Sequence, residues 1–295
     1  MSSEQLAVIL EISAQNPPPP NAGPVEMRAW FEGINAHTPI ADGSMIERVA
    51  SGPVGGDLIR LVGCDEAKLV IYFHGGGFFF GSARSHRVVA SNLARASGCA
   101  VLSADYRLAP EHPAPAAHDD AFAVYRWALD QGYPSSSIAL CGDSAGGNLA
   151  ISTAVRARDA GLPLPGALML MSPALDLADE LESHASVPDA PLLTPDLMGL
   201  FNTLYIGGGD RRSTSVTPLH GDLSGLPPTL VHVGTWELLR DDSIEIVKRI
   251  RAAGGAAELK VWEGMCHSWQ LFAPMLDEGM ASIEEAGTFL RQRLN

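Results

Sequence analysis

The pentapeptide Gly142-Asp-Ser-Ala-Gly146 constrains the fold of this chain more than any other segment. It stands between a short apolar run, 136–141, and a stretch of helix-forming residues, 145–160. Glycine at both ends allows a sharp strand-to-helix turn, in which Ser144 is forced into an unfavourable backbone conformation that exposes its Oγ. The unpaired N–H groups at the start of the helix, that of Ala145 above all, then face this oxygen as donors for an anion.

A second glycine-rich segment, His74-Gly-Gly-Gly77, lies upstream in a similar setting. It follows the apolar run 68–73, which is typical of a buried strand, and precedes a predicted helix at 84–96. Consecutive glycines let the backbone turn its amides toward a ligand, so we expect Gly76 and Gly77 to hold an oxyanion. Each motif alone is weak. Their order and their strand-loop-helix settings together indicate hydrolysis of an acyl group by a serine nucleophile.

Such a serine needs a general base, and in this architecture the acid and then the histidine follow it along the chain. Three histidines come late enough: His220, His232 and His267. His232 alternates within an apolar strand and is typical of a core histidine, whereas His220 lies in a polar loop. His267 follows the predicted strand 258–262 on a strand-to-helix loop, so it is the predicted base.

The carboxylate that orients the base should follow the preceding strand, 230–234, where Glu237, Asp241 and Asp242 are the candidates. Glu237 stands nearest to the end of that strand. Asp241 and Asp242 fall in the first turn of the next predicted helix, where acidic residues are common because they suit the helix dipole. Glu237 is therefore the predicted partner of His267, and Asp241 is the alternative.

At this point the chain resembles the bacterial hormone-sensitive-lipase-like esterases of the α/β-hydrolase superfamily. The resemblance covers about residues 68–272 in family order. It rests on His74-Gly-Gly-Gly-Phe-Phe-Phe-Gly-Ser82, Asp105-Tyr-Arg-Leu-Ala-Pro-Glu-His-Pro113, Gly142-Asp-Ser-Ala-Gly-Gly147, Glu237-Leu-Leu-Arg-Asp-Asp242 and Gly264-Met-Cys-His267, with Trp269 following.

The resemblance implies an α/β fold with a mostly parallel central sheet of about eight strands, flanked by helices and covered by a helical cap. Many members carry aspartate at the acid position, which keeps Asp241 open as the alternative. The matched site positions are Ser144 as nucleophile, His267 as base, Glu237 as acid, and Gly76, Gly77 and Ala145 as the oxyanion hole.

By the same resemblance, N-terminal helices in residues 1–45 and an insertion at about 177–209 form a cap over a catalytic domain of residues 46–295. Aromatic side chains around the site predict an apolar pocket that favours short-to-medium acyl esters, with lactones as a further candidate class. The candidate pocket residues are Phe78, Trp236, Trp269, Phe201 and Tyr205.

The charged, proline-bearing segment 105–113 resembles a binding loop, but a structural role is the favoured interpretation. Arg107 and Glu111 are expected to pair beneath the glycine loop, and Pro110 and Pro113 to stiffen the path of the chain.

Length and composition fit one parallel α/β domain, because 295 residues with 46% hydrophobic content can bury a large core. The net charge of -14 argues against nucleic acid, whose phosphates need a basic surface. No apolar stretch approaches the roughly 18 residues of a membrane span, and segment 6–12 is too short for a secretory signal. We therefore expect a cytoplasmic protein.

The expected chemistry requires no metal and no organic cofactor, and the expected ligand is a small-molecule ester. Family resemblance makes a homodimer plausible. Two other functions stay open: an amide or carbamate hydrolase with the same triad, and a non-catalytic small-molecule receptor on this scaffold, which the presence of His267 disfavours.

Overall fold

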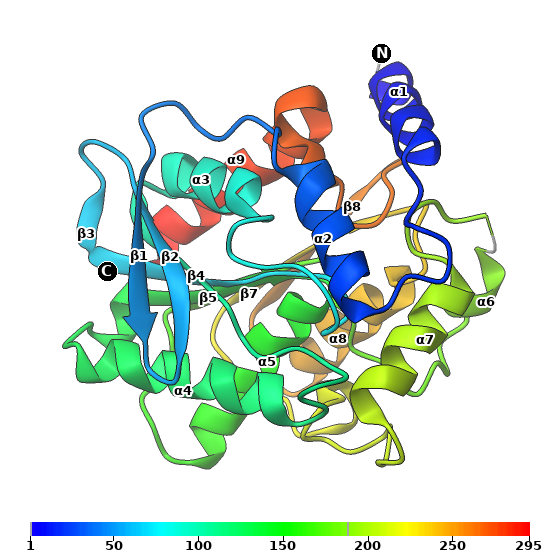
Figure 1. Cartoon of the computed structure of the whole chain (residues 1–295). Helices are drawn as coiled ribbons and strands as arrows, with labels where there is room; N and C mark the ends of the chain where they lie inside the picture. Colours follow the sequence, from blue (N-terminus) through cyan, green and yellow to red (C-terminus); the bar gives the residue numbers. More distant parts are fainter. Residues whose placement is uncertain (1, 188) are drawn as a thin grey trace.

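The fold is built around an eight-stranded sheet with the strand order β1-β2-β4-β3-β5-β6-β7-β8 (Figure 1). The computed structural model describes residues 2–187 and 189–295. Strands from β4 through to β8 pair in parallel, whereas β2 runs antiparallel to both β1 and β4. The predicted α/β class with a mostly parallel sheet is therefore confirmed. The strands are β1 (Met45–Ser51), β2 (Val54–Arg60), β3 (Asp65–Phe73), β4 (Cys99–Ala104), β5 (Ile138–Asp143), β6 (Ala167–Met171), β7 (Thr229–Gly234) and β8 (Ala257–Trp262).

From β3 onward, helices stand between successive strands along the chain. The helix expected at 84–96 begins later, because Ser82 and Ser85 bond to each other in a turn that precedes it. Among the residues that the structure describes, no helix has both the length and the apolarity needed to cross a bilayer. The helices are α1 (Ser2–Gln15), α2 (Pro24–Asn35), α3 (Arg87–Ser97), α4 (Ala116–Asp130), α5 (Ala145–Asp159), α6 (Ser183–Ser186), α7 (Pro195–Ile206), α8 (Arg240–Ala252) and α9 (Asp277–Arg293), with short 3-10 helices at Ser135–Ser137, Pro218–His220 and Trp269–Met275.

Alternate residues of the central strands fill two separate cores. In β3, Leu69, Ile71 and Phe73 pack in one core with α4, α5 and α8, while Val70 and Tyr72 pack in the other with α3 and α9. All five side chains are almost fully buried. When helices cover both faces of a strand, neither face is exposed to solvent. Such strands therefore appear in the sequence as continuous apolar runs.

Further helices lie beyond these layers and cover the loops at one end of the sheet (Figure 1). Met27 of α2 and Phe201 of α7 share a third apolar cluster with Phe79, which follows β3. Leu6 of α1 belongs to a fourth cluster, together with Trp269. The N-terminal segment and the insertion that contains α7 therefore pack against the same region of the domain.

A buried polar chain ties α7 to α4 and α5. Nδ1 of His118 lies 2.6 Å from the hydroxyl oxygen of Tyr205, and Nε2 lies 2.9 Å from Oδ1 of Asn148. Nδ2 of Asn148 donates to the carbonyl oxygens of Ala174 and Val216, so Oδ1 must accept and the histidine Nε2 must donate. Nδ1 then accepts from the tyrosine, which requires a neutral imidazole. Burial lowers the pKa of His118 to about 4, in keeping with this pattern.

The free energy of unfolding should fall as the pH drops from about 6.5 toward 4, partly because of His118. In the unfolded chain an imidazole takes up its proton near pH 6.5, whereas the folded-state pKa is about 4, so the unfolded state binds more protons in this window. In urea unfolding, His118→Gln should therefore show a weaker pH dependence than the wild type. The exposed His37 supplies the control, His37→Gln, which should keep the wild-type slope. An unchanged slope in His118→Gln would contradict the neutral bridge.

Two helical glycines should respond to alanine in opposite directions. A Cβ on Gly287 of α9 would lie 2.4 Å from the backbone carbonyl carbon of Ala96 in α3, whereas a Cβ on Gly199 of α7 would meet open space. Gly199→Ala should stabilise the fold by about 0.5–1 kcal/mol through helix propensity. Gly287→Ala should destabilise it by about 1–3 kcal/mol, because overpacking outweighs that gain. Thermal unfolding measures both, and a stabilised Gly287→Ala would disprove the close helix contact.

Candidate active site

Ser144 occupies the turn between β5 and α5 with φ 53° and ψ -120°. Residues with a side chain rarely adopt this conformation, so the backbone is strained there. The turn is tight because its neighbours are glycines. A Cβ on Gly146 would lie 1.9 Å from the carbonyl oxygen of Phe73, and one on Gly142 would lie 2.3 Å from the carbonyl carbon of Gly146. Helix α5 therefore begins directly against the end of β3.

The structure brings the predicted nucleophile, base and acid together. Oγ of Ser144 lies 3.0 Å from Nε2 of His267, and Nδ1 of His267 lies 2.9 Å from Oε2 of Glu237. The serine and the glutamate are buried, and the imidazole is 11% exposed. The three residues follow β5, β7 and β8, which are parallel strands of one sheet. Because the carboxyl ends of parallel strands meet at the same sheet edge, the fold joins residues that are far apart in sequence.

Glu237 is fixed by its second carboxylate oxygen. Oε1 accepts hydrogen bonds from Oγ of Ser172 at 2.8 Å and from the backbone N–H of Gly234 at 2.6 Å. Oε2 is left to face His267. Two neutral donors thus orient the carboxylate toward the imidazole. No motif in the sequence points to this role of Ser172.

The competing candidates from the sequence lie elsewhere. Asp241 accepts a hydrogen bond from the backbone N–H of Ser183, in the inserted segment. The buried Asp242 lies 2.6 Å from Nε2 of His184. His232 is buried in β7, and burial lowers its pKa to about 3, as befits a core histidine. The geometry therefore favours Glu237 over Asp241.

The glycine loop after β3 approaches the serine with an unusual backbone. Gly76, Gly77 and Phe78 have φ values of 111°, 61° and 58°. Glycine adopts this region freely, but a phenylalanine must be held in it by its surroundings. Gly77 and Ala145 both line the cavity beside the serine. A Cβ on Gly77 would lie 2.3 Å from the ring of Phe201, so the packing leaves no room for a larger residue.

Asp143, which precedes the serine, fastens this glycine loop to the turn. Its Oδ1 accepts from the backbone N–H of Gly75 at 2.8 Å and from the hydroxyl of Tyr72 at 2.5 Å. Its Oδ2 accepts from Oγ of Ser268 and lies 3.7 Å from Nε2 of His86. Burial alone would raise the pKa of Asp143, but the nearby His86, the hydrogen bond from Tyr72 and the charge of His267 hold it at about 2. This role of Asp143 was not predicted from the sequence, although its position beside the serine was a signal for it.

The cavity beside the serine is narrow and mostly apolar, with a volume of about 20 Å³. Two of the candidate pocket residues, Phe78 and Phe201, line it. The rest of its apolar wall consists of Ala174, Leu177, Leu193, Met198 and Leu239. The space fits a small apolar group near the serine.

The other three candidate pocket residues, Trp236, Trp269 and Tyr205, do not line this cavity. Trp269 is fully buried beneath α1, where its indole N–H donates to the carbonyl oxygen of Glu278. Trp236 packs at the edge of the same cluster. Tyr205 is fully buried behind Phe78, with the two ring centroids 4.0 Å apart. Trp269 and Tyr205 are large side chains that bury their apolar surface in the core.

The expected pair of Arg107 with Glu111 is wrong. Nε and Nη2 of Arg107 donate to Asp120 in α4. Glu111 accepts two hydrogen bonds from Arg28 of α2, 83 residues away. The partner of each charged side chain lies in a helix outside the segment 105–113, so the sequence of this segment alone does not determine the pairing.

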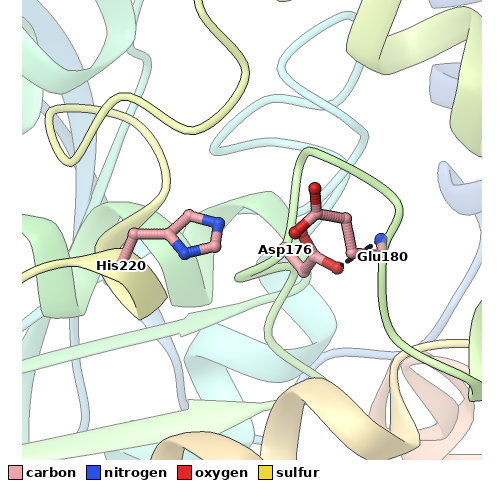
Figure 2. Close-up of side chains that lie close together, drawn as sticks. All are labelled: Asp176, Glu180 and His220. Carbon is pink, nitrogen blue, oxygen red and sulfur yellow. Dashed lines mark hydrogen bonds between the residues drawn. The ribbon is translucent and has the colours of Figure 1, made fainter.

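Figure 2 shows a cluster of residues that could hold a cation, formed by Asp176, Glu180 and His220. Their ligand atoms lie within 4.8 Å of one another. The oxygens of Asp176 already accept hydrogen bonds from the backbone N–H groups of Ala178, Glu180 and Leu181. The aspartate thus caps a turn of the inserted segment, and the chemistry of a serine nucleophile has no step that uses a metal.

Comparison with known proteins points in the same direction. Residues 70–271 match a family described by the alpha/beta hydrolase fold. The chain is 43% identical to an acetyl-hydrolase of Streptomyces hygroscopicus, over 77% of this chain and 76% of that protein. It is 39% identical to the carboxylesterase NlhH of Mycobacterium tuberculosis, over 75% of each protein.

Solved structures extend the similarity to the whole chain. An esterase from the bacterial hormone-sensitive lipase family is 39% identical and superposes with a TM-score of 0.96 over 99% of both chains. A hormone-sensitive lipase from a metagenome library is 36% identical, with a TM-score of 0.95 over 100% of this chain and 99% of that one. The resemblance noted in the sequence is thereby confirmed: this chain belongs to the α/β-hydrolase family, among the bacterial esterases of the hormone-sensitive lipase group.

Proposed function

We propose that this chain is a carboxylic ester hydrolase in which Ser144 is the nucleophile, His267 the general base and Glu237 the orienting acid. The observation that carries the proposal is the unbroken series of contacts from Oγ of the serine through the imidazole to the carboxylate. A serine hydroxyl is a weak nucleophile by itself, and this arrangement places a base within reach of its proton. Similar proteins are named as esterases and carboxylesterases, which supports the same reaction.

The first half of the reaction transfers the acyl group to the enzyme. Nε2 of His267 accepts the proton of Ser144 as Oγ bonds to the ester carbonyl carbon. The carbonyl oxygen becomes an oxyanion, which the backbone N–H groups of Gly76, Gly77 and Ala145 stabilise. The imidazolium then gives its proton to the alkoxy oxygen, the carbon–oxygen bond breaks, and the alcohol leaves.

The second half returns the serine to its resting state. His267 takes a proton from water as the water oxygen attacks the acyl carbon, and a second oxyanion forms in the same place. This intermediate collapses to a carboxylic acid, and Ser144 leaves with the proton from the imidazolium. Throughout, Glu237 holds the imidazole in the tautomer that carries its proton on Nδ1 and stabilises the imidazolium.

The substrates that fit this site are esters with short-to-medium acyl groups, with lactones as cyclic members of the same class. The narrow apolar cavity leaves little space next to Ser144 for a long chain. An apolar acyl group that fills the cavity would displace water from it, which would strengthen hydrogen bonds to the oxyanion. One similar protein, EstE5, has been soaked with p-nitrophenyl butyrate, a short-chain ester.

Residues 1–45 and 177–209 act in this proposal as a cap over the catalytic domain of residues 46–295. Contacts of α2 and α7 with Phe79, in one apolar cluster next to the glycine loop, support that assignment. A cytoplasmic location and a homodimer stay predictions from the sequence.

Single substitutions in the triad should separate the proposed roles. Ser144→Ala should abolish hydrolysis of p-nitrophenyl butyrate, and Glu237→Ala should lower kcat by about 10⁴-fold, because the imidazole loses its tautomer and its orientation. Asp241→Ala is the matched control, since its carboxylate bonds to Ser183 and not to the base. It should keep kcat within about threefold of the wild type.

Equal losses in Glu237→Ala and Asp241→Ala would contradict the assignment of the acid. A wild-type chain that hydrolyses a matched anilide as fast as the butyrate ester would favour an amide hydrolase instead. Covalent labelling of the wild type but not of Ser144→Ala by a fluorophosphonate would identify the nucleophile directly and exclude a receptor function.

Phe201 should limit the length of the acyl chain. Its ring lines the cavity and packs against Phe79 and Gly77. Phe201→Ala should raise kcat/KM for p-nitrophenyl octanoate relative to butyrate by about 10- to 100-fold, the range that a few methylene groups are worth in an apolar pocket. Leu200→Ala, at an exposed position of the same helix, should leave the ratio unchanged. A wild type that prefers the palmitate ester would contradict the size limit.

A further inference from the structure

We propose that Arg28 of the N-terminal helix α2 is a positioning residue for the oxyanion loop, which we define as residues 74–82. Its guanidinium would hold the loop in the conformation that presents the N–H groups of Gly76 and Gly77 to the substrate. This inference rests on the proposed function, since it concerns the same oxyanion.

Arg28 binds the backbone of two loops at once. Nε donates to the carbonyl oxygen of Phe79 at 2.9 Å, and Nη2 donates to the carbonyl oxygen of Ala109 at 2.7 Å. The same guanidinium donates to both carboxylate oxygens of Glu111, at 2.9 and 2.7 Å. The loops also bond directly, because the N–H of Ala109 donates to the carbonyl oxygen of Phe78 at 2.8 Å. The side chain of Arg28 thus joins the two loops at the same place where the backbone of Ala109 and the backbone of Phe78 are already bonded.

The oxyanion loop needs such an external support. Gly76, Gly77 and Phe78 in succession have positive φ values, and the third of these residues has a side chain that disfavours this conformation. Strained backbone persists only where surrounding contacts enforce it. Arg28 binds the residue that immediately follows this run. Its loss should therefore let the run relax and move the oxyanion donors.

Other contacts place α2 against the same loop. The rings of Phe31 and Phe80 have centroids 4.5 Å apart, and Oγ of Ser82 donates to the carboxylate of Glu32. The guanidinium of Arg28 also lies 5.8 Å from the ring centroid of Phe79. The N-terminal helix therefore contacts the oxyanion loop through several of its side chains.

The chemistry of the contact requires arginine. The planar guanidinium of Arg28 makes four hydrogen bonds in fixed directions, to two carbonyl oxygens and to both oxygens of a carboxylate, whereas the ammonium of lysine has only three N–H donors. Glu111 is 47% exposed, so its ion pair with Arg28 contributes little by itself. The two carbonyl contacts are the part that acts on the loop.

Arg28→Ala should lower kcat for p-nitrophenyl butyrate by about 10- to 100-fold, as a misplacement of about 1 Å in reacting groups does, with KM within about threefold. The affinity for an alkyl trifluoromethyl ketone should fall by the same factor. Oγ of Ser144 bonds to the carbonyl carbon of this inhibitor and gives its proton to His267. The carbonyl oxygen of the ketone becomes an oxyanion in the oxyanion hole. Binding of the product alcohol, which carries no oxyanion, should not change.

Arg158 provides the matched control. It donates to the carbonyl oxygens of Asp222 and Ser224 and to the carboxylate of Asp159, so it makes the same kinds of contact far along the chain from the loop. Arg158→Ala should therefore lower the thermal stability by a similar amount and leave kcat and the inhibitor affinity at the wild-type values.

Further measurements keep the test decisive. Guanidinium chloride at millimolar concentration should restore part of the kcat of Arg28→Ala, and sodium chloride at the same ionic strength should not. Where Arg28→Ala does not fold, Arg28→Lys takes its place, and it should show the kcat loss and the weaker inhibitor binding to a smaller degree.

Three results would overturn the inference while the proposed function stands: an active Arg28→Ala with unchanged kcat, a change in KM alone, or equal losses of kcat in Arg28→Ala and Arg158→Ala. A wild-type chain that hydrolyses no ester would overturn the proposed function and the inference with it.

Discussion

The contact between the start of α5 and the end of β3 is the constraint on which the rest of the site depends. Gly146 lies so close to the carbonyl oxygen of Phe73 that a Cβ would be 1.9 Å away. This approach sets the first N–H groups of α5 beside the glycine loop that leaves β3. This close approach also requires the chain to turn sharply from β5 into α5 at Ser144, which therefore has a positive φ. The same close contact between α5 and β3 therefore positions both the nucleophile and the expected oxyanion donors.

Buried polar groups then make this arrangement rigid. Asp143 binds the glycine loop through Gly75, and Glu237 binds the end of β7 through Gly234. In each case a carboxylate next to the site also accepts a hydroxyl hydrogen bond, from Tyr72 or Ser172. Such carboxylates are costly to bury unless every oxygen is satisfied, and once satisfied they fix the loops that they join. Oriented dipoles of this kind stabilise a charge without having to reorganise.

The helices outside the sheet are parts of the same site, and not only a cover over it. Tyr205 of α7 is bonded to His118 of α4 and lies behind Phe78, which lines the cavity. Arg28 of α2 binds the backbone next to that phenylalanine. Helices α2 and α7 therefore both contact the segment that includes Phe78. Under the proposed function, a change in either helix should alter both the choice of substrate and the placement of the oxyanion loop.

Local pattern and chain order were enough to predict the parallel sheet and the approach of Ser144, His267 and Glu237, because short apolar runs, glycine turns and the order of loops along a sheet edge are properties of neighbouring residues. They did not predict that Glu111 binds Arg28, or that Trp269 belongs to the core. An arginine, a glutamate or a tryptophan can be satisfied by many partners. Which partner it takes is decided by distances between elements remote in sequence, and those exist only in the folded chain.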